Sequence, residues 1–80
     1  MKVLFVGITW NSLALLSLTA GRGNRKRPTL EALVVRTPDM IFLQELHSTT
    51  TAAAIWEVPA GYRVVFAHWA NNSAGVGIMA

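Results

Sequence analysis

The sequence predicts an α/β fold in which strands and helices alternate along 80 residues, enough for at most one small domain. Two continuous apolar runs, at 2–9 and 40–43, are rich in β-branched and aromatic residues and are typical of strands buried on both faces. A segment with helical spacing of its apolar residues lies between them. The expected order is strand, helix, strand, short helix, strand, strand.

The first strand is expected over residues 2–9, closing at Trp10 and Asn11. Residues 12–18 fit either a loop packed on the core or a short helix. Glycines in 19–24 then indicate a break.

The main helix is expected to begin at Pro28, a residue favoured at the first helical position. Leu30, Leu33 and Val34 share one face, and Thr37-Pro38 ends the helix. In the second half, strands are expected at 40–45, 62–69 and 75–80, a threonine-capped helix within 48–59, and a turn at 70–75.

Composition favours a piece of a larger fold over a free-standing miniature domain. Hydrophobic residues make up 52% of the chain and charged residues 14%, well below the ~25% of an average soluble domain. The chain has no cysteine, which excludes thiolate zinc sites and cysteine nucleophiles and fits a reducing compartment.

Positive charge gathers in one place. Four of the seven basic residues are Arg22, Arg25, Lys26 and Arg27. Such a cluster indicates nuclear targeting or contacts to nucleic-acid phosphates. The alternative is a solvated, mobile loop.

Residues 1–20 also have features of a signal peptide, namely a basic second residue and an apolar body. The polar residues of TWNS interrupt that body, and Leu18 is poor for cleavage after Ala20. The apolar stretch is also shorter than a membrane span of ~20 residues. An intracellular location, the nucleus included, is therefore favoured over secretion, and no membrane partner is expected.

The second strand ends in an unusual way, because its apolar run leads directly to Gln44, Glu45 and His47. An ionised carboxylate is costly to bury without a partner, so Glu45 needs a cation, a hydrogen-bond network or open water.

Several of these stretches together resemble the endonuclease/exonuclease/phosphatase family. They are ITWN, KR before a helix, PDMIFLQELH, GYRVVFAHW and SAGVGIM, in this order. The most specific is the D-x-x-x-L-Q-E-x-H pattern from Asp39 to His47. The nearest branch is similar to the apurinic-site endonucleases at the front of non-LTR retrotransposon polyproteins. The resemblance implies a two-sheet β-sandwich flanked by helices, of which residues 1–80 supply the opening part.

The resemblance also implies a magnesium-dependent nuclease. Glu45 matches the family's metal-binding glutamate, and Asn11 matches the asparagine beside the metal and the scissile phosphate. Mg²⁺, or Mn²⁺ in its place, is the implied cofactor, since such ions take oxygen ligands and use one or two carboxylates. Gln44 and His47 are expected to hold Glu45 and Asn11 in position without binding the metal themselves. Arg25, Lys26 and Arg27 are expected to contact nucleic acid, DNA in the first instance.

The family's later motifs, which include its catalytic tyrosine and C-terminal histidine, have no counterpart among these residues; Tyr62 and His68 do not match them. Residues 1–80 are therefore expected to be inactive alone and to need the C-terminal half of the domain. The alternatives are a non-catalytic remnant and, more weakly, a small secreted protein.

Overall fold

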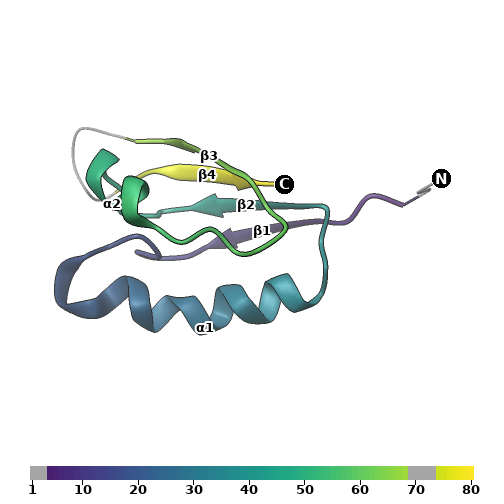
Figure 1. The fold of residues 1–80 in the computed structure, drawn as a ribbon, viewed down its shortest axis with the longest axis horizontal. Helices are drawn as coiled ribbons and strands as arrows, with labels where there is room; N and C mark the ends of the chain where they lie inside the picture. Colours follow the sequence, from purple (N-terminus) through teal and green to yellow (C-terminus); the bar gives the residue numbers. More distant parts are fainter. Residues whose placement is uncertain (1–3, 69–73) are drawn as a thin grey trace.

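The computed structural model describes residues 4–68 and 74–80 and confirms a mixed α/β fold (Figure 1). The elements are β1 (Gly7–Asn11), the 3-10 helix η1 (Thr19–Gly21), α1 (Arg22–Val35), β2 (Met40–Gln44), α2 (Thr50–Ile55), β3 (Val64–Ala67) and β4 (Val76–Met79). The four strands form one sheet in the order β1-β2-β4-β3. β1 runs parallel to β2, whereas β4 is antiparallel to both of its neighbours.

The strand register places the side chains in rows across the sheet. Two rows face the core: Ile8–Ile41–Met79–Val64 and Trp10–Leu43–Gly77–Phe66. The row between them, Thr9–Phe42–Ile78–Val65, points to the other side. Phe42 and Ile78 of that row remain 37% and 42% exposed, and Val65 is 74% exposed.

The expectation that the strands are buried on both faces is therefore wrong for the part of the chain described. Only one face is covered, and β1 and β3 lie at the two edges. The apolar residues of the open face predict a covering layer that these residues do not contain.

The core forms where α1 lies along the covered face of the sheet (Figure 1). Leu30 of α1 is completely buried with Ile41 and Leu43. Leu15 and Leu16, each 2% exposed, join the same cluster from the connection between β1 and η1. Of the two interpretations of residues 12–18, the packed loop is therefore correct.

The main helix begins six residues before Pro28, contrary to the expectation from the sequence. α1 starts at Arg22, directly after η1, so the basic cluster belongs to the first turns of a helix and not to a loop. Pro28 is accommodated because it lies on the exposed side, where water can bond the helical carbonyl left without a donor. The end of the helix is as predicted, with Thr37 at φ 50° just past it.

In the second half of the chain, the observed elements agree more closely with those expected from the sequence. Thr49 caps α2 by accepting a hydrogen bond from the Ala52 amide at 3.0 Å. β3 and β4 form where strands were expected, though each is shorter. The expected turn at 70–75 lies largely outside the described residues. Among the helices that are described, none is long and apolar enough to cross a membrane.

Candidate functional site at the carboxyl ends of β1 and β2

β1 and β2 end side by side, and each delivers a polar side chain there. Asn11, the last residue of β1, is the register partner of Gln44, the last residue of β2, and Glu45 follows directly. Neighbouring strands lie about 4.8 Å apart, so the two amide side chains are close. The carboxyl ends of adjacent parallel strands are where open α/β sheets most often bind ligands.

These three residues line one pocket. The pocket has a volume of about 260 Å³, and its other walls are Ala74, Gly75 and Val76, which lead into β4. Asn11, Gln44 and Glu45 are all exposed. None of their side chains makes a hydrogen bond to another residue within 4–68 or 74–80, so their oxygens are open to a ligand.

The backbone at Glu45 is in an unusual conformation. Glu45 has φ 50° and His47 has φ 51°, values that lie in the left-handed region and are uncommon for residues with a side chain. Glu45 therefore leaves the line of β2, while Leu46 between the two residues turns back into the core and is fully buried. Such conformations cost ~1–3 kcal/mol each and persist only where surrounding contacts impose them.

Two chain segments supply those contacts. The Ala14 amide donates to the Glu45 carbonyl at 2.7 Å, and the Leu16 amide donates to the Leu46 carbonyl at 3.0 Å. From the other side, the Leu46 amide donates to the Gly75 carbonyl at 3.1 Å. Glu45 is thus held between the connection that follows β1 and the segment that leads into β4.

Ser12 and Ser48 are two buried polar residues that the sequence analysis missed. The Ser12 hydroxyl donates to the Gln44 carbonyl at 3.1 Å, and it accepts a hydrogen bond from the Leu15 amide at 3.4 Å. The Ser48 hydroxyl shares a 2.6 Å hydrogen bond with Nδ1 of His68. Serine gives no burial signal in a sequence, so only the packing reveals them.

Neither histidine lines the pocket beside Glu45. His47 lines a separate pocket of about 110 Å³ together with Leu16, Ser17 and Thr49. His68 stacks on Phe66, with ring centroids 5.7 Å apart, and bonds Ser48. Tyr62 donates its hydroxyl hydrogen to the Pro38 carbonyl at 2.7 Å, just before β2 begins and therefore at the opposite end of that strand from Glu45.

Asp39, the first residue of the D-x-x-x-L-Q-E-x-H pattern, has a structural position. Its carboxylate accepts a hydrogen bond from the Val6 amide at 2.7 Å, and its own amide donates to the Val6 carbonyl at 2.8 Å. These bonds fasten the start of β1 to the start of β2. The pattern thus fixes the register at one end of the strand pair and presents Glu45 at the other.

The basic cluster lies at the same end of the sheet as Glu45 but on the helix-covered side. α1 returns the chain between two parallel strands, so its first turn lies near their carboxyl ends (Figure 1). Arg22 and Arg25 are exposed and Lys26 is half-buried.

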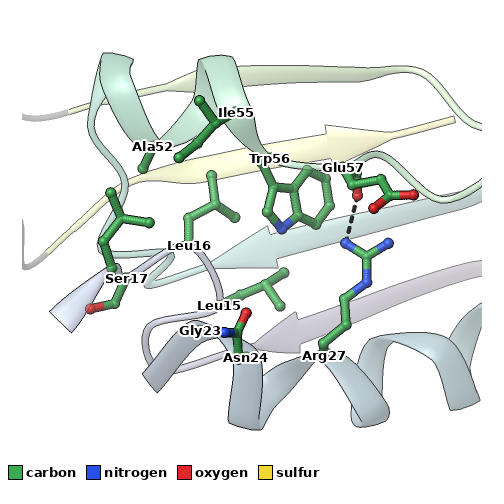
Figure 2. Close-up of a pocket in the computed structure, with 11 residues that line it drawn as sticks. Leu15, Leu16, Ser17, Gly23, Asn24, Arg27, Ala52, Ile55, Trp56 and Glu57 are labelled. Carbon is green, nitrogen blue, oxygen red and sulfur yellow. Dashed lines mark hydrogen bonds between the residues drawn. The ribbon is translucent and has the colours of Figure 1, made fainter. Parts of the chain in front are cut away.

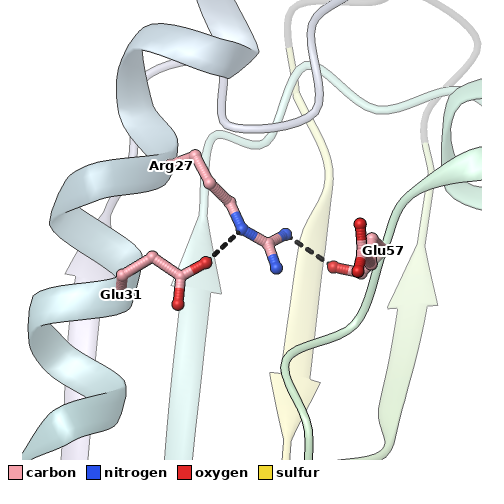
Figure 3. Close-up of polar contacts among 3 residues, drawn as sticks. All are labelled: Arg27, Glu31 and Glu57. Carbon is pink, nitrogen blue, oxygen red and sulfur yellow. Dashed lines mark hydrogen bonds and ion pairs between the residues drawn. The ribbon is translucent and has the colours of Figure 1, made fainter.

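Arg27 is engaged within the chain (Figure 3). Its Nε donates to Glu31 Oε1 at 2.8 Å, and its Nη1 donates to the Glu57 carbonyl at 2.5 Å. The guanidinium also lies 5.1 Å from the centroid of the Trp56 ring, within cation–π range. Arg27 therefore joins α1 to the connection between α2 and β3.

A second, larger pocket of about 320 Å³ lies between α1 and α2 (Figure 2). Its walls are apolar and polar in similar parts, and they include Leu15, Leu16, Ile55 and Trp56 together with Asn24, Arg27 and Glu57. None of its lining residues belongs to a strand, and its arginine is already bonded to the Glu57 carbonyl, whereas the pocket beside Glu45 lies at the carboxyl ends of β1 and β2. The arrangement favours the pocket beside Glu45 as the site of chemistry.

The donor set beside Glu45 consists of oxygen atoms from one carboxylate and two amides. Within 4–68 and 74–80, no three His, Cys, Asp or Glu side chains come together as a metal-binding group. This set suits Mg²⁺ or Mn²⁺, which accept oxygen ligands, retain several waters and are often held by a single protein carboxylate. It does not suit zinc, which prefers nitrogen and sulfur.

Comparison with known proteins gives no family assignment: no protein-family model matches the chain, and no curated protein matches it.

Proposed function

We propose that this chain is the opening part of a Mg²⁺-dependent phosphodiesterase that acts on nucleic acid, as its resemblance to the endonuclease/exonuclease/phosphatase family implies. One observation carries the proposal: Asn11, Gln44 and Glu45 line one pocket at the carboxyl ends of two adjacent parallel strands. The two strand ends were assigned to the site from separate motifs, and the fold brings them together.

The residues would divide the work by their chemistry. Glu45 would supply the charge that holds the divalent ion, and the ion would supply stabilisation of negative charge developing on the scissile phosphate. Asn11 can donate a hydrogen bond to a phosphate oxygen from its amide without adding repulsion. Gln44 lies between them and can orient either the ion's water shell or the Asn11 amide.

The set is incomplete as catalytic machinery. Hydrolysis of a phosphodiester needs a group that accepts a proton from water and one that protonates the leaving oxygen. Neither His47 nor His68 lines the pocket. We therefore infer that further groups come from a covering second sheet, which would also bury the row Thr9–Phe42–Ile78–Val65.

The alternative of a secreted protein fits the packing less well. Removal of residues 1–20 would delete β1 together with Leu15 and Leu16, which belong to the core. Asn11 and its pairing with Gln44 would be lost as well. Mass spectrometry of the protein from cells should accordingly find no cleavage after Ala20.

Titration with Mn²⁺ tests the metal site, with electron paramagnetic resonance reporting the free ion. The chain should bind one ion in the millimolar range typical of sites with few carboxylates. Glu45→Gln should abolish binding because it keeps the shape and removes the charge. Glu57→Gln, at an exposed carboxylate outside the pocket, is the matched control and should bind as the unaltered chain does. Equal binding by the Glu45→Gln variant would refute the site, and absence of binding by the unaltered chain would favour the non-catalytic remnant.

A further inference from the structure

We propose that Ser12 is a positioning residue for this site: its buried hydroxyl sets the relative placement of Asn11 and Glu45. The inference rests on the proposed function, because it assigns Ser12 a role in ion binding at the same pocket. Ser12 is 1% exposed and directly follows Asn11, the last residue of β1, and its hydroxyl reaches across to the end of β2.

Ser12 holds the end of β2 with two groups, its amide and its hydroxyl. Its amide donates to the Gln44 carbonyl at 2.9 Å, and its hydroxyl donates to the same carbonyl at 3.1 Å. The hydroxyl oxygen also lies 3.5 Å from the Glu45 carbonyl. The peptide group between Gln44 and Glu45 is therefore fixed against the residue that follows Asn11, at the point where the backbone turns to φ 50°.

The same hydroxyl closes the turn after β1. Leu13 and Ala14 both have positive φ, at 47° and 87°, and neither is glycine. The Leu15 amide, which belongs to a residue 2% exposed, uses Ser12 Oγ as its acceptor. Without the hydroxyl, that buried amide has no acceptor among residues 4–68 and 74–80, and the turn that carries Ala14 to the Glu45 carbonyl loses its closure.

The consequence for an ion follows from geometry. Asn11 and Glu45 are on different strands, so their side chains converge only if the two strand ends keep one relative placement. Some residues orient metal ligands without touching the metal, and their mutation commonly lowers metal affinity by 10–100-fold. A hydroxyl that merely filled space would lower stability without a selective effect on ion binding.

The Mn²⁺ titration described above, applied to the full chain, separates these roles. Ser12→Ala is expected to raise the Mn²⁺ dissociation constant about tenfold. Ser12→Thr, which returns a hydroxyl, should recover most of the affinity. Ser48→Ala is the matched control, because Ser48 is equally buried but its hydroxyl bonds His68 and not the end of β1 or β2. It should lower the urea midpoint of unfolding and leave the dissociation constant unchanged.

The outcomes distinguish the inference from the proposed function. If Glu45→Gln abolishes binding while Ser12→Ala binds as tightly as the unaltered chain, the metal site stands and the role of Ser12 is overturned. If Ser12→Ala and Ser48→Ala weaken binding equally, the effect belongs to stability and the inference is again overturned. If Glu45→Gln has no effect, the proposed function fails and the role of Ser12 fails with it.

Discussion

At the scale of single residues, the contacts of Arg27 divide the basic cluster into two kinds of side chain. Arg27 is bonded to Glu31 and Glu57 and lies over Trp56. In the first turns of α1, Arg25 is exposed to solvent and Lys26 is half-buried. We therefore expect phosphate contacts from Arg25 and Lys26, and a mainly structural role for Arg27.

The salt dependence of DNA binding separates these roles. The slope of log K against log salt is negative, and each lost phosphate contact reduces its magnitude by about one. The double variant Arg25→Ala/Lys26→Ala should therefore reduce that magnitude by roughly two. Arg27→Ala should leave the slope unchanged and destabilise the fold by about 1–2 kcal/mol, the sum of its exposed ion pair, its bond to a carbonyl and its ring contact. Anisotropy titrations on a labelled duplex and urea unfolding at micromolar protein provide the two readouts. An unchanged slope in the double variant would show that Arg25 and Lys26 do not contact phosphates and are only solvated side chains.

At the scale of elements, the start of α1 illustrates the limit of prediction from the sequence. Apolar spacing correctly indicated the helix and its end, because those depend on local residues. Glycines in 19–24 indicate a break and Pro28 indicates a helix start, yet the helix already begins at Arg22. Tertiary packing requires glycine at position 23. A Cβ at Gly23 would lie 2.5 Å from the Leu15 carbonyl oxygen and 2.7 Å from the Ser17 carbonyl oxygen.

A substitution at Gly23 tests this explanation by the sign of its effect. Helix propensity alone predicts that Gly23→Ala stabilises by nearly 1 kcal/mol. The close approach of the backbone predicts instead a loss of about 1–3 kcal/mol. Asn24→Ala, one position further along at an exposed site, should stabilise slightly and serves as the control. Urea unfolding followed by circular dichroism measures both, and a more stable Gly23→Ala variant would show that the helix start is free to move.

The same distinction applies to the candidate site. The positions of Glu45 and Asn11 at strand ends could be expected from the sequence, because each follows an apolar run. Their roles in ion binding come from the family resemblance and stay a prediction. Ser12 and Ser48 could not be predicted, because their roles depend on carbonyls and rings that lie 20 to 33 residues away.

At the scale of the whole molecule, the dominant feature is a sheet with one covered face. The exposed row Thr9–Phe42–Ile78–Val65 runs across all four strands. Apolar side chains that adjoin one another in this way form the kind of patch that monomeric proteins rarely leave open. The patch explains why the sequence indicated burial on both faces.

We expect this face to drive association of the isolated chain. Sedimentation velocity should show species larger than a monomer at tens of micromolar. Val65→Thr with Ile78→Thr keeps β-branched side chains in the strands while reducing their apolar surface, and should shift the chain toward monomer without loss of strand content. A parallel Val35→Thr variant, exposed at the end of α1, should associate as the unaltered chain does. A chain that remains monomeric would show that the face needs no covering layer.

Under the proposed function, Glu45 presents the metal-binding carboxylate of a nuclease whose remaining groups lie outside residues 1–80. Nicking of supercoiled plasmid tests it most directly. Residues 1–80 alone should not nick with Mg²⁺ present, whereas the same residues fused to the C-terminal half of an apurinic-site endonuclease-like protein should. Glu45→Gln should abolish nicking by the fusion and leave its circular dichroism spectrum unchanged. Mg²⁺-dependent nicking by the isolated chain that persists in the Glu45→Gln variant would contradict both the site and the need for a second half.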